Sequence, residues 1–356
     1  MARIEEAFLR ILSRREFLYL GAGAAIGASY SHSARARPAP LPLTGVNLSG
    51  AEGGALPGVY AHDYIYPHSE LIDYYISLGF NVIRLPFRWE RLQPNLSGPF
   101  AEAEQKQLTN LSAYISARGA NIILDPHNYA RRALASDSWN SFHLIGSREV
   151  PALAFADFWR RLAALFKDNP RVIFGLMNEP FDIAPPIWLS IVNKTIAAIR
   201  AEGAGNLILA PGVAFSGAHS WISAGNGAMA GIEDPAKNFA IEVHQYLDTD
   251  SSGTHPDAVS RTIGSERIRA FEAWARKHNL RAFLGEFGAS QDQTSLAALT
   301  DLLTTLEESP DIWLGWTAWA GGSWWPENYM FNLDAVKGAE RPQTKILASF
   351  AKQGRG

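Results

Sequence analysis

The sequence predicts an α/β protein, a (β/α)8 or TIM barrel formed by a single domain. Eight short apolar segments recur about 38 residues apart, which accommodates one strand, one helix and two loops. Helical patterns separate these segments, and polar residues follow nearly all of them. A doubly wound open sheet is the alternative, but no Gly-rich phosphate-binding loop opens any predicted helix, so we favour the barrel.

The predicted strands are apolar runs, as is typical of parallel strands that are buried on both faces. In chain order they are LTGVNL (43–48), NVIRLP (81–86), NIILDP (121–126), RVIFGLMN (171–178), NLILAP (206–211), FAIEVHQY (239–246), RAFLGEF (281–287) and IWLGWTAW (312–319). The length of 356 residues fits two average domains, but one barrel routinely uses ~250 residues or more. No linker rich in Pro, Ser or Thr follows residue 45, so we predict one domain without an appended module.

The predicted helices place apolar residues at helical spacing. In the segment 68–79, Leu71, Tyr75 and Leu78 share a face, and Gly79 suits the position after the helix C-terminus. The other predicted helices are 152–170, 185–203, 263–279 and 292–308. Their alternation with the strands supports the barrel.

The composition excludes several classes of protein. Hydrophobic residues make up 47% and charged residues 19%, which excludes a disordered chain. The formal net charge is −3, so we expect no nucleic-acid partner. The chain has no Cys, which excludes disulfides and a thiolate nucleophile, and it has no H-x-H or H-x-x-x-H pair. We therefore expect no metal site.

The N-terminus resembles an export signal. Residues 13–20 read SRREFLYL, a twin-arginine pattern, and a short apolar stretch follows from Phe17 to Tyr30. Ala34-Arg35-Ala36 fits the small-x-small cleavage rule, so we predict a signal peptide over 1–36 and a mature domain over 37–356. An uncleaved membrane anchor is the alternative. We expect a monomeric protein, free of the membrane after cleavage, in the periplasm or outside the cell.

Polar residues gather where the predicted strands end. In such barrels the catalytic face lies at the strand C-termini, so these side chains are candidates for one site. They are Asn47, Arg84, His127, Asn128, Asn178, Glu179, His244, Tyr246, Glu286 and Trp319. Only the fifth strand lacks such a residue.

Two of these residues are carboxylates that directly follow buried apolar runs. Glu179 follows VIFGLMN and Glu286 follows FLG, so each must be paired, hydrogen-bonded or functional. Two facing carboxylates suit glycoside hydrolysis, in which one donates a proton and the other attacks the sugar or activates water. Their separation, which decides the stereochemical outcome, is not given by the sequence.

The aromatic residues and the other carboxylates have several interpretations. Because sugar rings stack on indole, we expect Trp319 and Trp89 to contact substrate, and we assign Trp159 and Trp274 to the core. Trp324 and Trp325, in a Gly-rich loop, fit either role. Glu242 shares a strand face with His244, deeper in the strand, so we expect it to have a structural, hydrogen-bonding role. Glu52 and Glu90 are loop candidates for contacts to sugar hydroxyls.

Six motifs in order resemble one enzyme family. RLPFRWERLQP (84–94), LDPHNYAR (124–131), MNEP (177–180), GEFG (285–288) and GWTAWAGGSWW (315–325) closely resemble glycoside hydrolase family 5. The stretch AIEVHQYLDTDSSGTH (240–255) resembles its subfamily 5, the endo-β-1,4-glucanases (cellulases). The resemblance covers residues 43–334. Other members carry Cys residues that staple loops, which this chain lacks.

The resemblance implies a retaining hydrolase without a cofactor. Glu179 would be the acid/base and Glu286 the nucleophile, with Arg84 bonded to the nucleophile. Asn178 would hold the sugar 2-hydroxyl, while Trp319 would form the floor of a subsite lined by three further residues: His127, His244 and Tyr246. We expect Arg84 and Tyr246 to lower the pKa of Glu286.

The expected function is therefore that of an exported retaining endo-β-1,4-glucanase acting on cellulose-type glucans. The same chemistry on mannan, xyloglucan or mixed-linkage glucan is the nearest alternative, because only loop contacts distinguish these substrates. A non-catalytic carbohydrate-binding barrel is a third reading, but such a protein would be expected to lack one of the two carboxylates, and both are present.

Overall fold

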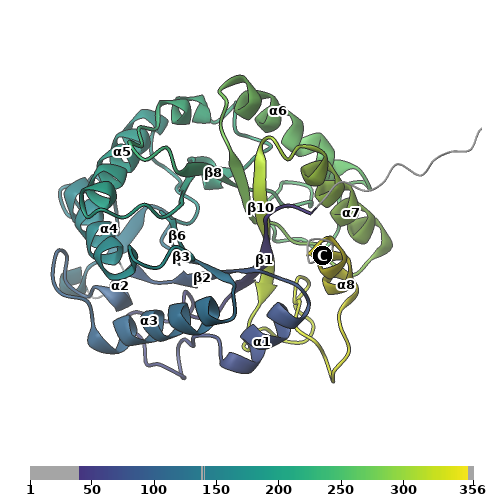
Figure 1. The fold of residues 1–356 in the computed structure, drawn as a ribbon, viewed down its shortest axis with the longest axis horizontal. Coiled ribbons are helices and arrows are strands. Elements are labelled where there is room, and N and C mark those ends of the chain that lie inside the picture. Colours follow the sequence, from purple (N-terminus) through teal and green to yellow (C-terminus); the bar gives the residue numbers. More distant parts are fainter. Residues whose placement is uncertain (1–39, 138, 140, 352–356) are drawn as a thin grey trace, which may run out of the picture. The chain divides into compact units, whose positions relative to one another are not determined.

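A computed structural model describes residues 40–137, 139 and 141–351 of the chain, and its centre is a closed barrel of eight parallel strands (Figure 1). Neighbours around the barrel follow the order β1-β10-β9-β8-β7-β6-β3-β2. The strands are β1 (Leu43–Leu48), β2 (Val82–Phe87), β3 (Asn121–Pro126), β6 (Val172–Gly175), β7 (Ile208–Pro211), β8 (Phe239–His244), β9 (Ala282–Glu286) and β10 (Trp313–Gly321). All eight predicted strands are present, and the predicted fold class is confirmed.

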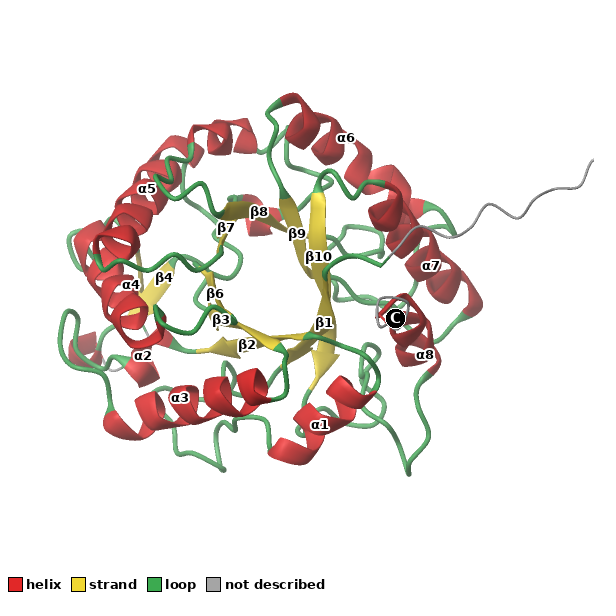
Figure 2. Ribbon diagram, in the orientation of Figure 1, coloured by secondary structure: helices red, strands yellow, loops and turns green. Residues whose placement is uncertain are grey.

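Helices surround the barrel (Figure 2). They are α1 (Ser69–Ser77), α2 (Trp89–Leu92), α3 (Glu102–Ala117), α4 (Ala152–Phe166), α5 (Pro185–Ala201), α6 (Ile263–Lys277), α7 (Gln293–Glu308) and α8 (Pro342–Ala351). Sequence patterns predicted five of these. The sequence analysis missed α3, where Leu108 and Ile115 are the only large apolar side chains that are buried, together with α2, α8 and the hairpin of β4 (Arg131–Ala133) and β5 (Phe142–Leu144).

The predicted signal peptide lies outside the described residues. Within residues 40–351, as far as they are described, no helix has the length and apolar character needed to cross a membrane.

The inside of the barrel is filled in two layers, because alternate residues of each strand point inward. An apolar layer is formed by side chains from six strands, separate from the main core under the helices. It consists of Val82, Ile123, Ile173, Leu209, Ala240 and Phe283.

A charged layer lies next to the apolar layer, two residues further along three of the same strands. This layer consists of Arg84, Asp125 and Glu242, all at most 1% exposed. The charged layer forms the base of the polar face predicted at the strand C-termini.

A register shift between β8 and β9 decides which residue of β9 reaches the site. Val243 pairs with Leu284, but the next residue, His244, pairs with Glu286, so Gly285 is an extra residue on β9. Strict alternation from the inward-facing Phe283 would point Glu286 away from the barrel interior. The bulge turns the Glu286 carboxylate toward the strand ends instead.

Candidate active site

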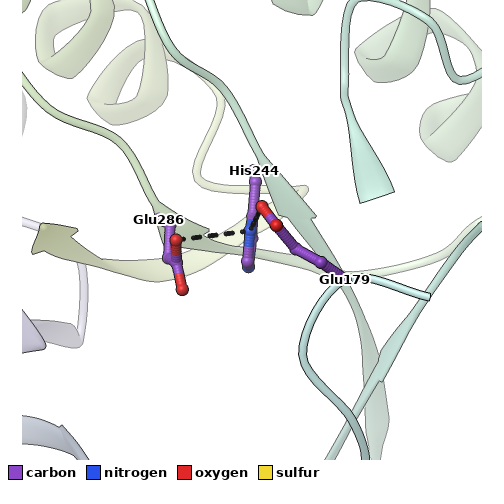
Figure 3. Close-up of side chains that lie close together, drawn as sticks. All are labelled: Glu179, His244 and Glu286. Carbon is purple, nitrogen blue, oxygen red and sulfur yellow. Dashed lines mark hydrogen bonds and ion pairs between the residues drawn. The ribbon is translucent and has the colours of Figure 1, made fainter. Parts of the chain in front are cut away.

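Glu179 and Glu286 meet at the C-terminal end of the barrel, on either side of His244 (Figure 3). One carboxylate oxygen of each glutamate lies within 4.8 Å of the other and of a ring nitrogen of His244. Glu286 ends β9, whereas Glu179 follows β6 in a left-handed conformation with φ of 45°. That conformation is unfavourable for a non-glycine residue, so the surrounding structure must hold Glu179 in place.

Glu286 is bound from two sides. The Arg84 guanidinium donates a hydrogen bond of 2.7 Å to its Oε1, and the Tyr246 hydroxyl donates one of 3.0 Å to its Oε2. The expectation that these partners give a lowered pKa is wrong: burial raises the pKa of Glu286, and the opposing effects of His244 and Arg84 do not fully offset it. The physical reason is that desolvation of the buried carboxylate, together with the nearby Glu179, outweighs the attraction of the two cations.

His244 contacts both carboxylates. Its Nδ1 lies 2.7 Å from Oε1 of Glu179 and 3.7 Å from Oε2 of Glu286. Burial disfavours the charged imidazole, but the negative charge of Glu286 and the contacts with Glu179 and Glu242 raise the pKa of His244 to about 10. His244 is therefore an imidazolium at neutral pH.

Asn178 is held in one orientation by Arg84 and His127. Arg84 Nη2 donates a 2.8 Å hydrogen bond to Asn178 Oδ1, so the Asn178 amide nitrogen faces His127 Nε2 at 3.1 Å. The other His127 nitrogen, Nδ1, lies 2.8 Å from Oδ2 of Asp125. The Arg84 guanidinium can only donate hydrogen bonds, so the Asn178 atom that it contacts must be the amide oxygen. The amide nitrogen of Asn178 therefore donates a hydrogen bond to His127 Nε2.

Trp319 lies beside these residues and is partly exposed. Its ring stacks against His127 with centroids 5.7 Å apart, and its Nε1 donates to the Tyr329 hydroxyl at 3.0 Å. Trp325 stacks on Tyr329 at 4.0 Å, whereas Trp324 is 44% exposed. Its partial exposure is compatible with contact between the Trp319 ring and a sugar.

The core assignments of two other Trp residues are confirmed. Trp159 is fully buried and Trp274 is 7% exposed.

Three sequence expectations are wrong. Trp89 is fully buried against Phe155 and Phe158 of α4, so no sugar can stack on its ring. Asn128 is also buried: its side chain accepts from the Trp89 amide and donates to Glu90, and it therefore holds a loop rather than substrate. Glu90 is buried too and accepts from the Ala133 amide, which removes it from contact with sugars.

Glu52 has an intermediate position. Its carboxylate accepts hydrogen bonds from the Ser49 hydroxyl and the Gly50 amide, and the residue is partly exposed. These bonds hold the loop after β1, and a contact of Glu52 with substrate stays a prediction.

A cavity of about 540 Å³ adjoins Glu179, His244 and Tyr246. Several of its lining residues were missed from the sequence, because the loop after β7 carries no polar residue directly at the strand end. Phe215, 50% exposed, is the largest lining residue of this loop. The lining consists of Tyr129, Glu179, Ala214, Phe215, Gly217, His219, Ser220, His244, Tyr246, Asp250, Ser251, Ser252 and Thr254.

Two groups of side chains are spaced closely enough to offer metal ligands. The first consists of Glu179, His244 and Glu286, whose mutual contacts are described above. In the second, Asp248 is buried and accepts backbone hydrogen bonds from its own loop, while Asp250 and His255 are exposed.

Comparison with known proteins decides the family. A model described as cellulase (glycosyl hydrolase family 5) matches residues 36–322. The chain belongs to glycosyl hydrolase family 5. As a member of this cellulase family, it is an enzyme.

This chain matches its relatives and the solved structures over nearly their whole length. Endo-β-1,4-glucanase A of Emericella nidulans is 39% identical over 311 residues, covering 86% of this chain and 91% of the relative. The structure of XacCel5A in complex with cellopentaose has a TM-score of 0.83 at 44% identity, covering 87% and 99%. The Pseudomonas stutzeri endoglucanase Cel5A in complex with cellobiose has a TM-score of 0.81 at 31% identity, covering 90% and 96%.

Proposed function

We propose that the protein is an exported, retaining endo-β-1,4-glucanase of subfamily 5. The observation that carries the mechanism is the approach of the two carboxylates, whose oxygens lie within 4.8 Å. Retaining glycosidases place these groups about 5–5.5 Å apart, whereas inverting enzymes leave room for a water between them. Glu179 and Glu286 are the catalytic residues.

In the first step Glu286 attacks the anomeric carbon while Glu179 donates its proton to the departing glycosidic oxygen. The C–O bond to the leaving sugar breaks, and an ester bond to Glu286 forms. In the second step Glu179 takes a proton from water, whose oxygen displaces Glu286 and regenerates both groups. Arg84 and Tyr246 hold the nucleophile toward the sugar.

The remaining strand-end residues bind the sugar being cleaved. Asn178, held by Arg84 and His127, presents its amide to the 2-hydroxyl, and Trp319 stacks beneath the ring. His244 lies between the two catalytic carboxylates. These roles agree with the hydrogen bonds and the partial exposure of Trp319.

The substrate follows from the relatives. They are named endo-β-1,4-glucanases, and solved relatives were studied with cellopentaose and cellobiose, so a β-1,4-glucan is the proposed substrate. The stretch 240–255 supports subfamily 5, and the SRREFLYL segment supports export to the periplasm or beyond. The proposed form of the enzyme is a monomer. Mannan, xyloglucan and mixed-linkage glucan stay as alternatives, since the catalytic residues are common to all of them.

The substitution Glu179→Gln tests the assignment. The amide keeps the shape of the side chain but donates no acidic proton, so hydrolysis of carboxymethylcellulose should fall about 10²–10⁴-fold. Formation of the glycosyl ester from an aryl glycoside with a good leaving group should be much less affected. Wild-type turnover of carboxymethylcellulose by this variant contradicts the assignment.

Two further measurements define the substrate and the outcome. Wild-type activity on carboxymethylcellulose is compared with that on mannan and xyloglucan, and the anomer first released from a cello-oligosaccharide is identified by NMR. We expect the β-anomer and a preference for the glucan. Release of the α-anomer contradicts the retaining mechanism.

A further inference from the structure

Glu242 is a fully buried carboxylate for which the proposed mechanism has no role. It lies on β8 in the charged layer, below His244. Its Oε1 is 3.0 Å from Arg84 Nε and 3.7 Å from His244 Nε2, and among the described residues no well-aligned hydrogen bond reaches either oxygen. An isolated buried anion is costly, so these two cationic side chains must balance its charge.

Gly285 leaves space for this carboxylate. A Cβ at Gly285 would collide with Glu242 Oε1, whereas a Cβ at Gly175 would lie at ordinary contact distance from Oε2, 3.8 Å. The position of Gly285 on β9 therefore carries no side chain where the carboxylate lies. This arrangement fixes Glu242 between Arg84 and His244.

Counting charges shows why Arg84 alone is insufficient. Its guanidinium lies within 3.2 Å of three carboxylates, those of Asp125, Glu242 and Glu286. One cation cannot balance three anions. A second cation is needed among the surrounding residues.

The hydrogen bonds identify which histidine supplies it. Asp125 raises the pKa of His127 against the effect of burial, but a proton on Nε2 would face the amide hydrogens of Asn178. His127 therefore stays neutral while that contact exists. His244 has carboxylates at both ring nitrogens, Glu179 at Nδ1 and Glu242 at Nε2, and so it is the second cation.

We propose that Glu242 is a positioning residue whose buried negative charge fixes Arg84 and keeps His244 protonated between the two catalytic carboxylates. The inference rests on the proposed function for the roles of Glu179 and Glu286. With Nε2–H directed at Glu242, the Nδ1–H of His244 is left to donate to Glu179 when Glu179 has lost its proton. The imidazolium thereby holds the acid/base in place for the second step.

A charge at Glu242 also sets the proton affinity of its neighbours. Removing it disfavours the charged imidazole, so the pKa of His244 falls. Glu242 faces Arg84 on β2 and His244 on β8, and His244 also faces Glu179 after β6 and Glu286 on β9. Asp125 on β3 shares Arg84 with Glu242 and contacts His127, while Tyr246 after β8 donates to Glu286.

The test is Glu242→Gln, with Glu272→Gln as the matched control. Glu272 lies on α6, is also buried and accepts from Trp313 Nε1 at 2.7 Å, outside the site. In Glu242→Gln, the basic limb of kcat/KM on a soluble cello-oligosaccharide should move to lower pH by about one pH unit or more. The limb of Glu272→Gln should not move.

NMR of the ¹⁵N-labelled imidazole, assigned by comparison with His244→Gln, gives a readout that needs no activity. We expect His244 to stay protonated through pH 8 in the wild type and to lose its proton at lower pH in Glu242→Gln. The proposal is overturned if Glu242→Gln changes neither the basic limb of kcat/KM nor the pH at which His244 loses its proton. A residue with only a packing role would lower stability without shifting either quantity. If Glu242→Gln does not fold, a wild-type His244 that titrates below pH 7 overturns it. An inactive wild type refutes only the proposed function.

Discussion

The apolar layer and the charged layer lie one inward step apart on the same strands, yet they have opposite energetics. From Val82 to Arg84, Ile123 to Asp125 and Ala240 to Glu242, two residues of chain exchange an apolar side chain for a charged one. Burying an apolar side chain stabilises the fold by about 1.5–3 kcal/mol. Burying a charge is costly unless partners compensate it.

The difference teaches where this enzyme concentrates its stability and where it places its chemistry. The apolar layer closes the barrel below the site and carries no titratable group. In the charged layer, by contrast, each side chain depends on the others to balance its buried charge. Substitutions in the two layers should therefore fail in different ways.

Arg84→Met should have the largest effect, because it leaves several buried carboxylates without their shared cation. We expect a loss of about 3–5 kcal/mol in the free energy of unfolding. The acidic limb of kcat/KM should move to higher pH, since the pKa of Glu286 rises when the cation is removed. Denaturant unfolding and a pH profile on a soluble cello-oligosaccharide measure both; an acidic limb that stays in place contradicts the pairing.

Phe283→Ala removes the largest side chain of the apolar layer. The cavity should lower the free energy of unfolding by about 3–5 kcal/mol, comparable to the loss in Arg84→Met. The pH limbs should stay at wild-type positions when measured well below the unfolding temperature. A shift as large as that of Arg84→Met would show that the two layers are not energetically distinct.

Gly285→Ala tests whether the space that Gly285 leaves beside the Glu242 carboxylate is needed. Its added methyl collides with Glu242, so we expect a loss of about 1–3 kcal/mol and reduced kcat. Gly205→Ala is the control, because a Cβ there meets no atom within 4 Å. Equal kcat values for the two variants, measured at one pH, would contradict the proposed crowding.

Asp292→Ala should have the smallest effect, since this carboxylate caps α7 outside the barrel. Burial alone would raise the pKa of Asp292, but hydrogen bonds from Ser290, Ser295 and Thr294 lower it to about 2. The cap should contribute about 1 kcal/mol, fully present above pH ~4 and lost as the pH falls toward 2. Unfolding of both proteins at pH 7 and pH 2.5 checks this; a difference that does not shrink at low pH contradicts it.

Several features were predictable from the sequence because they depend on neighbouring residues. Apolar runs marked all eight barrel strands, and residues at their ends include Arg84, Asn178, Glu179 and His244, which the structure brings together. Short apolar runs suffice for this purpose because parallel strands are buried on both faces. Helix α3 escaped prediction because few of its residues are apolar and buried.

The tertiary structure alone decided which of these side chains face the site. The bulge at Gly285 turns Glu286 inward, a left-handed φ orients Glu179, and packing of α2 on α4 buries Trp89. The sequence determined the barrel, its strand-end chemistry and the presence of two carboxylates. Their separation and the partners of Glu242 depend on register between strands that are far apart in the chain, and no local pattern encodes that register.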